Sequence, residues 1–262
     1  MSVGLFLDVD QTLTNGIIQH FFAREFGYES EFLEIEKEFQ ESGTAPKEFN
    51  SRLLPLMRRS GVTFSKLAEV GKKLPLQSWA EDLLKIEDAE IYLVSSGPNF
   101  YINNLAEKFG IPLERVYCSK YFFEEGTGLI QLNSQGVSVG GKADFVSQHA
   151  KKYAVSIGIG DDVTLDGPFI SQCSLGFLTQ PNESYFYAPN FELIRNTIRI
   201  LSRSLTTANT TIVSSVDQLT ELSIFAILKS LKVSQVAWLF AAIVGYTSAV
   251  YAISAFIVKF IK

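Results

Sequence analysis

The sequence contains only two cysteines and two histidines among its 262 residues. Cys118 and Cys173 stand far apart and form no CxxC pair, so they offer no cysteine metal site and fit a reduced, cytosolic compartment. His20 and His149 fall in predicted helices and belong to no Ser-His-Asp set. We therefore interpret both histidines as surface or packing residues rather than as catalytic ones.

Positively charged residues are also fewer than negatively charged ones. The chain has 23 Lys and Arg against 28 Asp and Glu, which gives a net charge of -5, and it has no long basic run. A nucleic-acid surface needs concentrated positive charge, so we expect no nucleic-acid partner. The N-terminus runs directly into an apolar strand without a basic leader. We therefore expect no signal peptide and a main domain that stays in the cytoplasm.

The longest run without charge lies near the C-terminus. Residues 236–258 are 23 positions without a charged side chain, enough at ~1.5 Å per residue to cross a bilayer core of ~30 Å. We predict a single membrane-spanning helix there; the alternative is a buried helix packed on the main domain. Residues 205–215 are rich in Thr and Ser and predict a linker. Residues 216–233 have the apolar spacing of an amphipathic helix.

Before residue 205, strand-like apolar segments alternate with helical ones. The predicted strands are 4–9, 90–94, 116–118, 153–159 and 174–178, and the predicted helices are 17–26, 31–41, 47–59, 64–73, 99–109, 142–152 and 191–204. Residues 121–131 predict a hairpin around Gly126 and Gly128. The alternation predicts an α/β fold with a Rossmann-like parallel sheet and helices on both faces. We expect the core to comprise residues 1–13 and 76–204, with a helical insertion at 14–75.

Four polar motifs occur at the ends of these segments. They are Asp8 and Asp10 after the first strand, Ser95 and Ser96 after the second, Lys142 at a helix start, and Asp161, Asp162 and Asp166 after the strand 153–159. Each motif alone has an ordinary explanation, such as a solvated turn or a surface lysine. Crowded carboxylates, however, repel one another and usually indicate a cation site or a solvated loop. A hydroxyl and free N–H groups at a strand's carboxyl end suit a phosphate oxygen.

In this order and spacing the motifs resemble those of the haloacid dehalogenase (HAD) superfamily, over about residues 3–200. The matching residues are Asp8, Asp10, Thr12, Ser95, Lys142, Gly160, Asp161 and Asp166, with Ser96 and Asp162 as alternatives at their motifs. The joint match is far more specific than any one motif. The helical insertion at 14–75 resembles the C1 cap of the family's phosphoserine phosphatase-like branch.

The resemblance implies a Mg²⁺-dependent phosphomonoester hydrolase that works through an aspartyl-phosphate. Asp8 would be the nucleophile and Asp10 the general acid and base. Ser95 and Lys142 would hold the transferring phosphoryl group. Mg²⁺ would be bound by Asp8, the backbone carbonyl of Asp10 and Asp161, with either Asp162 or Asp166 in support. An acid at position 10 favours phosphatases over the family's transporting ATPases.

The sequence departs from the phosphoserine phosphatases at one position. These enzymes carry a glutamate seven residues after the second motif aspartate, where it recognises the substrate amine, and this chain has Ile17 there. We therefore expect a different small phosphorylated metabolite or a membrane-borne phosphate ester as the substrate. Two alternatives stay open, namely a catalytically silent, membrane-tethered scaffold and a phosphotransferase with an acceptor other than water.

Overall fold

A seven-stranded sheet lies at the centre of the computed structural model, which describes residues 3–42, 46–180, 186–187, 192 and 194–201. The strand order is β4-β3-β2-β1-β5-β6-β7. The strands are β1 (Val3–Leu7), β2 (Glu90–Pro98), β3 (Val116–Phe123), β4 (Ile130–Gln135), β5 (Val155–Gly160), β6 (Leu175–Leu178) and β7 (Phe186–Tyr187). Neighbouring strands are parallel except β3 and β4, which form an antiparallel hairpin. The predicted α/β class with a mainly parallel, Rossmann-like sheet is confirmed.

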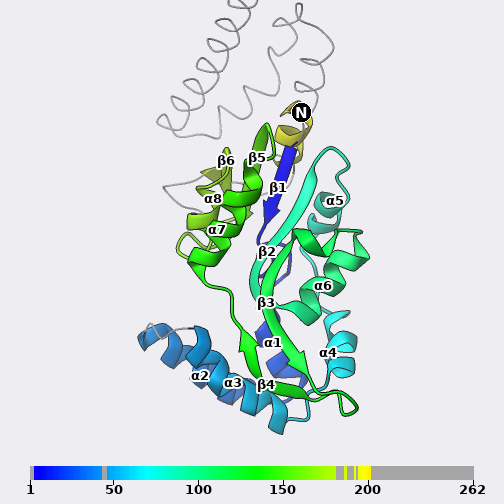
Figure 1. Cartoon of the computed structure of the whole chain (residues 1–262), viewed down its shortest axis with the longest axis vertical. Helices are drawn as coiled ribbons and strands as arrows, with labels where there is room; N and C mark the ends of the chain where they lie inside the picture. The colour runs from blue at the N-terminus through cyan, green and yellow to red at the C-terminus, as the bar shows by residue number, and fades with distance from the viewer. Residues whose placement is uncertain (1–2, 43–45, 181–185, 188–191, 193, 202–262) are drawn as a thin grey trace, which may run out of the picture. The chain divides into compact units, whose positions relative to one another are not determined.

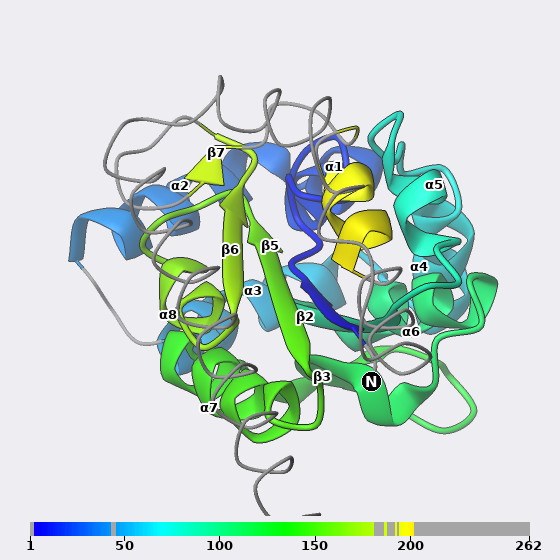
Figure 2. The ribbon, with the colours of Figure 1, turned by 90° about the horizontal axis from the view of Figure 1, so that it is seen from above.

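Helices cover both faces of this sheet (Figure 2). They are α1 (Ile18–Glu25), α2 (Glu29–Ser42), α3 (Pro46–Arg59), α4 (Phe64–Gly71), α5 (Ala80–Leu84), α6 (Asn99–Lys108), α7 (Val139–Ala150) and α8 (Gly167–Ile170), with a 3₁₀ turn η1 at Leu113–Arg115. Leu5 and Leu7 of β1 join the core with α5 and α6, whereas Phe6 joins the core with α7 and α8. Successive strand side chains point to opposite faces, so a strand buried on both faces reads as one apolar run.

The chain leaves the sheet after β1 for the helices α1–α4 and returns through a narrow neck. In this neck the N–H of Asn15 donates to the carbonyl of Pro75 at 2.8 Å, and the N–H of Gln77 donates to the carbonyl of Leu13 at 2.8 Å. The four helices gather around the β3–β4 hairpin (Figure 1). The N–H of Phe64 donates to the carbonyl of Gly128 at 2.9 Å. The helical insertion therefore rests on both the neck and the hairpin.

Several elements are longer than the sequence predicted. Strand β2 continues to Pro98 and β3 to Phe123, so the predicted hairpin at 121–131 is only the turn of a longer one. Helix α5 and strand β7 were not predicted. Helix α7 begins at Val139, three residues before the predicted start, because the hydroxyl of Ser138 accepts a hydrogen bond from Gly141 N–H and caps the helix. Of the predicted helix 191–204, residues 194–201 are helical.

The predictions for the C-terminal segment concern residues that the structure does not describe. The linker at 205–215, the amphipathic helix at 216–233 and the membrane span at 236–258 all lie outside the described ranges. Among the residues that are described, none of the helices has both the length and the apolar character needed to cross a bilayer. The membrane span therefore stays a prediction.

Candidate active site

Three carboxylates converge at the carboxyl ends of two neighbouring strands. Asp8 follows β1 directly and Asp161 follows β5, and these two strands pair in parallel. Asp166 precedes the first residue of α8. One carboxylate oxygen from each of the three residues lies within 4.8 Å of the other two. The sheet therefore gathers acids that lie more than 150 positions apart in the sequence into one site.

Of the two supporting acids that the sequence left open, Asp166 is the one beside Asp8 and Asp161. Its Oδ2 accepts hydrogen bonds from the N–H groups of Asp161 at 3.1 Å and of Asp162 at 3.3 Å. The carboxylate of Asp162 instead accepts the N–H groups of Thr164 and Leu165 and shapes the loop. A side chain at Gly160 would place its Cβ 2.6 Å from the Asp166 carboxylate, which explains the glycine there.

Lys142 is buried among these acids, on the first turn of α7. Its Nζ donates to Asp8 Oδ1 at 2.8 Å and to Asp166 Oδ1 at 2.9 Å. The exposed fractions of the Lys142, Asp8 and Asp166 side chains are only 3%, 5% and 2%. A charge withdrawn from water this far is tolerated only with close partners of opposite charge. Lys142 is therefore part of the site and not a solvated surface lysine.

The site carries more negative charge than Lys142 compensates. Burial raises the pKa of Asp8 well above its usual range; Asp166 raises it further, while Lys142 opposes both effects. Burial also raises the pKa of Asp161 to about 7, with further contributions from the charges of Asp166 and Asp162. Carboxylate oxygens are the ligands that Mg²⁺ prefers. Asp8, Asp161 and Asp166 thus form a donor set that fits a small divalent cation.

Asp10 lies beside this cluster and contacts the helical insertion. Its Oδ1 accepts a hydrogen bond of 2.7 Å from the N–H of Ile18, the first residue of α1. Burial raises the pKa of Asp10 to about 6, although the Ile18 N–H bond opposes part of this shift. A carboxyl group with this pKa can release and accept a proton near neutral pH. The predicted metal contact through the Asp10 backbone carbonyl stays a prediction.

The hydroxyl candidates on β2 occupy different environments. Ser95 is fully buried and its Oγ accepts a hydrogen bond of 2.9 Å from the N–H of Gly97. A Cβ added at Gly97 would lie 2.9 Å from Asp10 Oδ2 and 3.1 Å from Ser95 Oγ, so Ser95 and Asp10 approach the same point. Ser96 is exposed, and its carbonyl accepts a hydrogen bond from Ser119. Ser95 is therefore the hydroxyl that the structure brings to the site.

Two side chains on the loop after β1 hold Asp161 in place. Thr12 Oγ1 donates to Asp161 Oδ1 at 3.4 Å, and Gln11 Nε2 donates to Asp161 Oδ2 at 3.2 Å. Gln11 also has a φ of 58°, and among the described residues it is the only one other than glycine with a positive φ. Sequence reasoning missed Gln11, because it lies at a variable position of the DxDxT pattern. A glutamine gives no sequence signal for left-handed backbone.

We compared the chain with protein families, curated proteins and solved structures. No family model and no curated protein matches the sequence. Solved structures do match. One is a HAD family hydrolase from Salmonella enterica serovar Typhi, with a TM-score of 0.59, 15% identity and coverage of 67% of this chain and 61% of that one. That match spans less than two thirds of the Salmonella protein.

Two further structures match over most of their own length. A phosphoserine phosphatase carrying a phospho-aspartyl intermediate analogue matches with a TM-score of 0.53 and 20% identity, over 68% of this chain and 87% of that one. A phosphoserine phosphohydrolase-like protein from Francisella tularensis matches with a TM-score of 0.54 and 16% identity, over 76% and 100%. Identities this low establish the fold alone. The chain thus has the α/β fold of the HAD-family hydrolases and phosphoserine phosphatases.

Proposed function

We propose that this chain is a Mg²⁺-dependent phosphomonoester hydrolase that forms an aspartyl-phosphate on Asp8. The observation that carries the proposal is the buried contact of Lys142 Nζ with both Asp8 and Asp166, beside Asp161. A phosphoryl group that reaches Asp8 would meet a fixed positive charge in a site largely closed to water. Stabilisation of this kind accounts for most of catalysis in phosphoryl transfer.

The proposed reaction has two steps. In the first, a carboxylate oxygen of Asp8 attacks phosphorus, the bond to the leaving oxygen breaks, and Asp10 gives its proton to the departing alcohol. In the second, Asp10 takes a proton from water, whose oxygen attacks phosphorus and releases phosphate from Asp8. The pKa of Asp10, raised to about 6 mainly by burial, suits both roles. Ser95 and Lys142 hold the phosphoryl oxygens.

Three carboxylates would hold the cation. Asp8, Asp161 and Asp166 offer oxygens within 4.8 Å of one another, and burial together with the charges of Asp166 and Asp162 raises the pKa of Asp161, a strain that a cation would relieve. A bound Mg²⁺ would supply additional positive charge to the transferring phosphoryl group. Gln11 and Thr12 orient Asp161 for this contact.

The test is phosphate release from p-nitrophenyl phosphate by the purified full chain, with and without Mg²⁺. We expect turnover that depends on Mg²⁺ and stops in excess EDTA. No release with any divalent cation would contradict the proposal and favour the silent scaffold. Release that rises only with added alcohols, accompanied by phosphorylated alcohol as the product, would indicate a phosphotransferase.

We propose in addition that residues 236–258 anchor the protein in a membrane, with the catalytic domain in the cytoplasm. The support is the uncharged run itself, together with two cysteines that stand far apart in the sequence and fit a reducing compartment. The protein should then sediment with membranes and resist extraction with carbonate. A full-length protein that stays monomeric in solution without detergent would contradict the anchor.

A further inference from the structure

A small cavity lies between the helical insertion and the core. Its volume is about 10 Å³, which is room for a single group the size of a water molecule. Gln19, Tyr28 and Tyr121 line it with hydrogen-bonding groups, and Phe22 and Met57 are among its apolar walls. The cavity therefore combines a few polar atoms with a mostly apolar lining, and its size admits one small polar group and not a whole ligand.

The cavity is close to the proposed acid, Asp10. Gln19, in the cavity wall, directly follows Ile18, whose N–H donates to Asp10. Pro98, also in the wall, directly follows Gly97, and a Cβ added at Gly97 would lie 2.9 Å from Asp10 Oδ2. Burial raises the pKa of Tyr121, and the negative charge of Asp10 raises it further, which requires proximity. A group that receives its proton from Asp10 would therefore lie near the residues that line this cavity.

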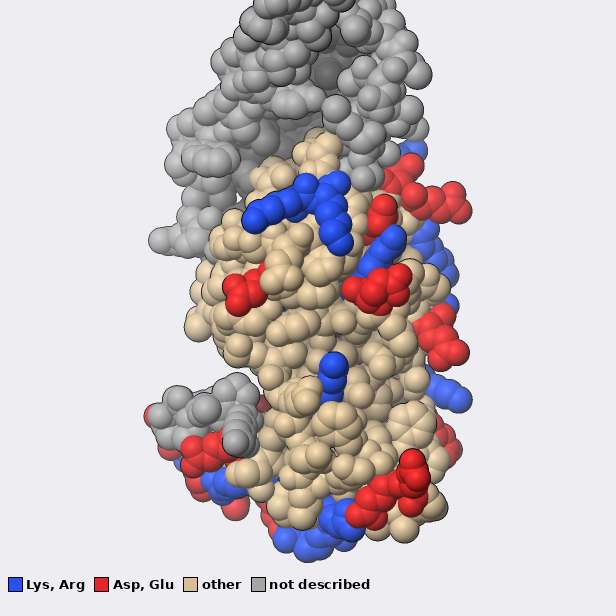
Figure 3. Space-filling model, in the orientation of Figure 1, with Lys and Arg blue, Asp and Glu red and all other residues tan. Residues whose placement is uncertain are grey.

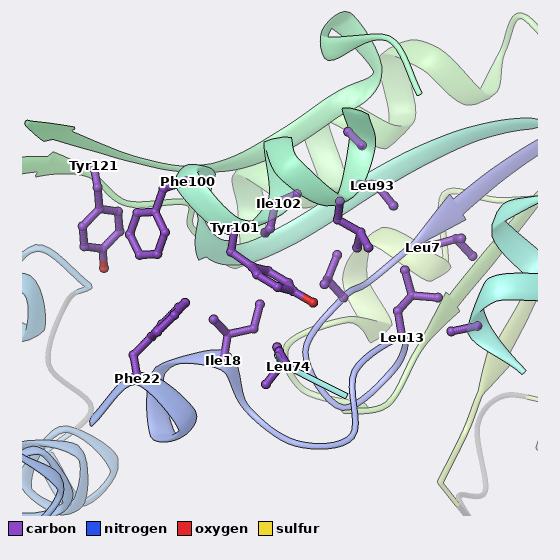
Figure 4. Close-up of a cluster of buried hydrophobic side chains, with 14 of the residues drawn as sticks. Leu7, Leu13, Ile18, Phe22, Leu74, Leu93, Phe100, Tyr101, Ile102 and Tyr121 are labelled. Atoms are coloured by element: carbon purple, nitrogen blue, oxygen red, sulfur yellow. The ribbon is translucent and has the colours of Figure 1, made fainter. Parts of the chain in front are cut away.

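Tyr121 is held rigidly at the cavity. Its hydroxyl donates to Asn50 Oδ1 at 2.8 Å and accepts from Gln19 Nε2 at 3.4 Å. Its backbone N–H donates to Asn99 Oδ1 at 2.9 Å, and its carbonyl accepts from Asn99 Nδ2 at 3.3 Å. The ring extends from β3 toward the helical insertion (Figure 4). The side chain and the backbone of Tyr121 thus both have hydrogen-bond partners that set the position of its hydroxyl.

Charge is missing from this lining. None of the described residues that line the cavity is charged. His20 and Glu36, on neighbouring helices of the insertion, lie 2.8 Å apart and are partners of each other. Ile17 stands at the position where an amine-binding glutamate would be expected. A buried ammonium or carboxylate without a partner is strongly disfavoured, whereas a hydroxyl needs only one donor and one acceptor.

From this geometry we infer that the cavity receives an uncharged hydroxyl group of the leaving alcohol. The substrate class is then the phosphate monoesters of neutral, hydroxylated alcohols and not those of amino alcohols. Tyr121 and Gln19 are the residues that determine this specificity. The inference rests on the proposed phosphatase function and specifies the substrate of that same site.

The experiment compares matched esters on the purified full chain with Mg²⁺. The esters are 2-hydroxyethyl, ethyl and 2-aminoethyl phosphate, and the corresponding three-carbon set, so that the reach of the hydroxyl is varied. We expect kcat/KM to fall by about threefold to tenfold when the hydroxyl is replaced by hydrogen, the range of one neutral hydrogen bond. The ammonium esters should fall at least as far. An ammonium ester that matches or exceeds its hydroxyl counterpart would overturn the inference.

Variants assign the effect to the cavity. Tyr121→Phe should lower the ratio of kcat/KM for the preferred hydroxyalkyl ester over its alkyl counterpart toward one, and Gln19→Met should act in the same direction without removing the Tyr121–Asn50 bond. Tyr153→Phe is the matched control, because its hydroxyl bonds to Tyr92 and Glu90 at the opposite end of the sheet. Thermal melts identify any variant that has lost its fold.

The outcomes separate the two proposals. If p-nitrophenyl phosphate is hydrolysed but the matched esters react equally, the substrate inference is wrong and the phosphatase function stands. If the ratio changes as much in Tyr153→Phe as in Tyr121→Phe, the assignment to this cavity is wrong. If no ester releases phosphate, the proposed function fails and the inference fails with it.

Discussion

Two buried polar clusters lie close to Asp10, and they differ in charge. The first joins Lys142 to Asp8 and Asp166. The second joins Tyr121 to Asn50 and Gln19 and contains no ionic group. Buried charges are costly unless paired, whereas neutral hydrogen bonds contribute about 1 kcal/mol each. In the proposed mechanism, the charged cluster is the one that meets the phosphoryl group, and the neutral cluster is the one that meets the leaving alcohol.

Charged side chains elsewhere are spread over the surface. On the face shown in Figure 3, most of the surface is uncharged, and the Lys and Arg side chains form small groups that lie apart from one another. Exposed pairs such as Arg24 with Glu29 and Lys85 with Glu81 contribute little to stability. Lys142 differs from these residues, because removing it would leave buried carboxylates without their partner, which is far more costly than breaking an exposed pair.

Asp8→Asn should have the largest effect, on the charged cluster. The change is nearly isosteric and removes the nucleophile, so turnover of p-nitrophenyl phosphate should fall by several orders of magnitude. Phosphate release and circular dichroism measure the loss and the retained fold. Asp144→Asn, on the exposed side of α7, is the control and should keep full activity. Near-normal turnover in Asp8→Asn would refute the covalent mechanism.

Lys142→Met should destabilise the protein through the same cluster. It leaves Asp8 and Asp166 buried without their partner, and breaking a buried ion pair costs about 3–5 kcal/mol. Urea unfolding near pH 8 measures the loss, and it should be smaller at lower pH, because burial raises the pKa of Asp8 and its protonated form no longer needs the cation. The exposed Lys152→Met is the control. Equal stability of the two variants would show that the buried pair contributes nothing.

Mg²⁺ should stabilise the protein in a pH-dependent manner. Burial, with the charges of Asp166 and Asp162, raises the pKa of Asp161 to about 7, so the charged form costs stability above that pH. This cost disappears as the pH falls through 7 toward the ordinary value of about 4. Saturation at 100 times the dissociation constant adds about 2.7 kcal/mol. We expect a larger thermal shift with Mg²⁺ at pH 7.5 than at pH 5; the reverse order would contradict the cation site.

The neutral cluster should give the smallest effect. A double-mutant cycle with Tyr121→Phe and Asn50→Ala should yield a coupling energy of about 0.5–1.5 kcal/mol in urea unfolding. Tyr153→Phe with Asn50→Ala is the control pair and should be additive, because these two residues belong to different clusters. A coupling energy as large as the loss of stability in Lys142→Met would show that the neutral cluster is bound as strongly as the charged one, which contradicts the expected order.

The sequence predicted the parts of the site that follow local rules. Asp8 and Asp161 directly follow apolar strands, and strand ends are readable from runs such as residues 4–9. The choice between Asp162 and Asp166 depends on which carboxylate turns into the loop, which no local pattern encodes. The Tyr121–Asn50 contact joins residues 71 positions apart, so it requires the packed fold. The early start of α7 was hidden because Gly140 and Gly141 resemble a loop.

The neck between Leu13 and Gln77 fixes where the helical insertion leaves and rejoins the core. An isolated antiparallel bridge joins Thr14 to Leu76, so the chain leaves the core and returns to it at adjacent points. The entropy of closing a longer or shorter insertion changes only slowly with its length. Substitutions on the inner face of residues 19–75 would therefore change what the insertion presents to the site, while the strands that carry Asp8 and Asp161 and the Ile18 N–H that contacts Asp10 remain as they are.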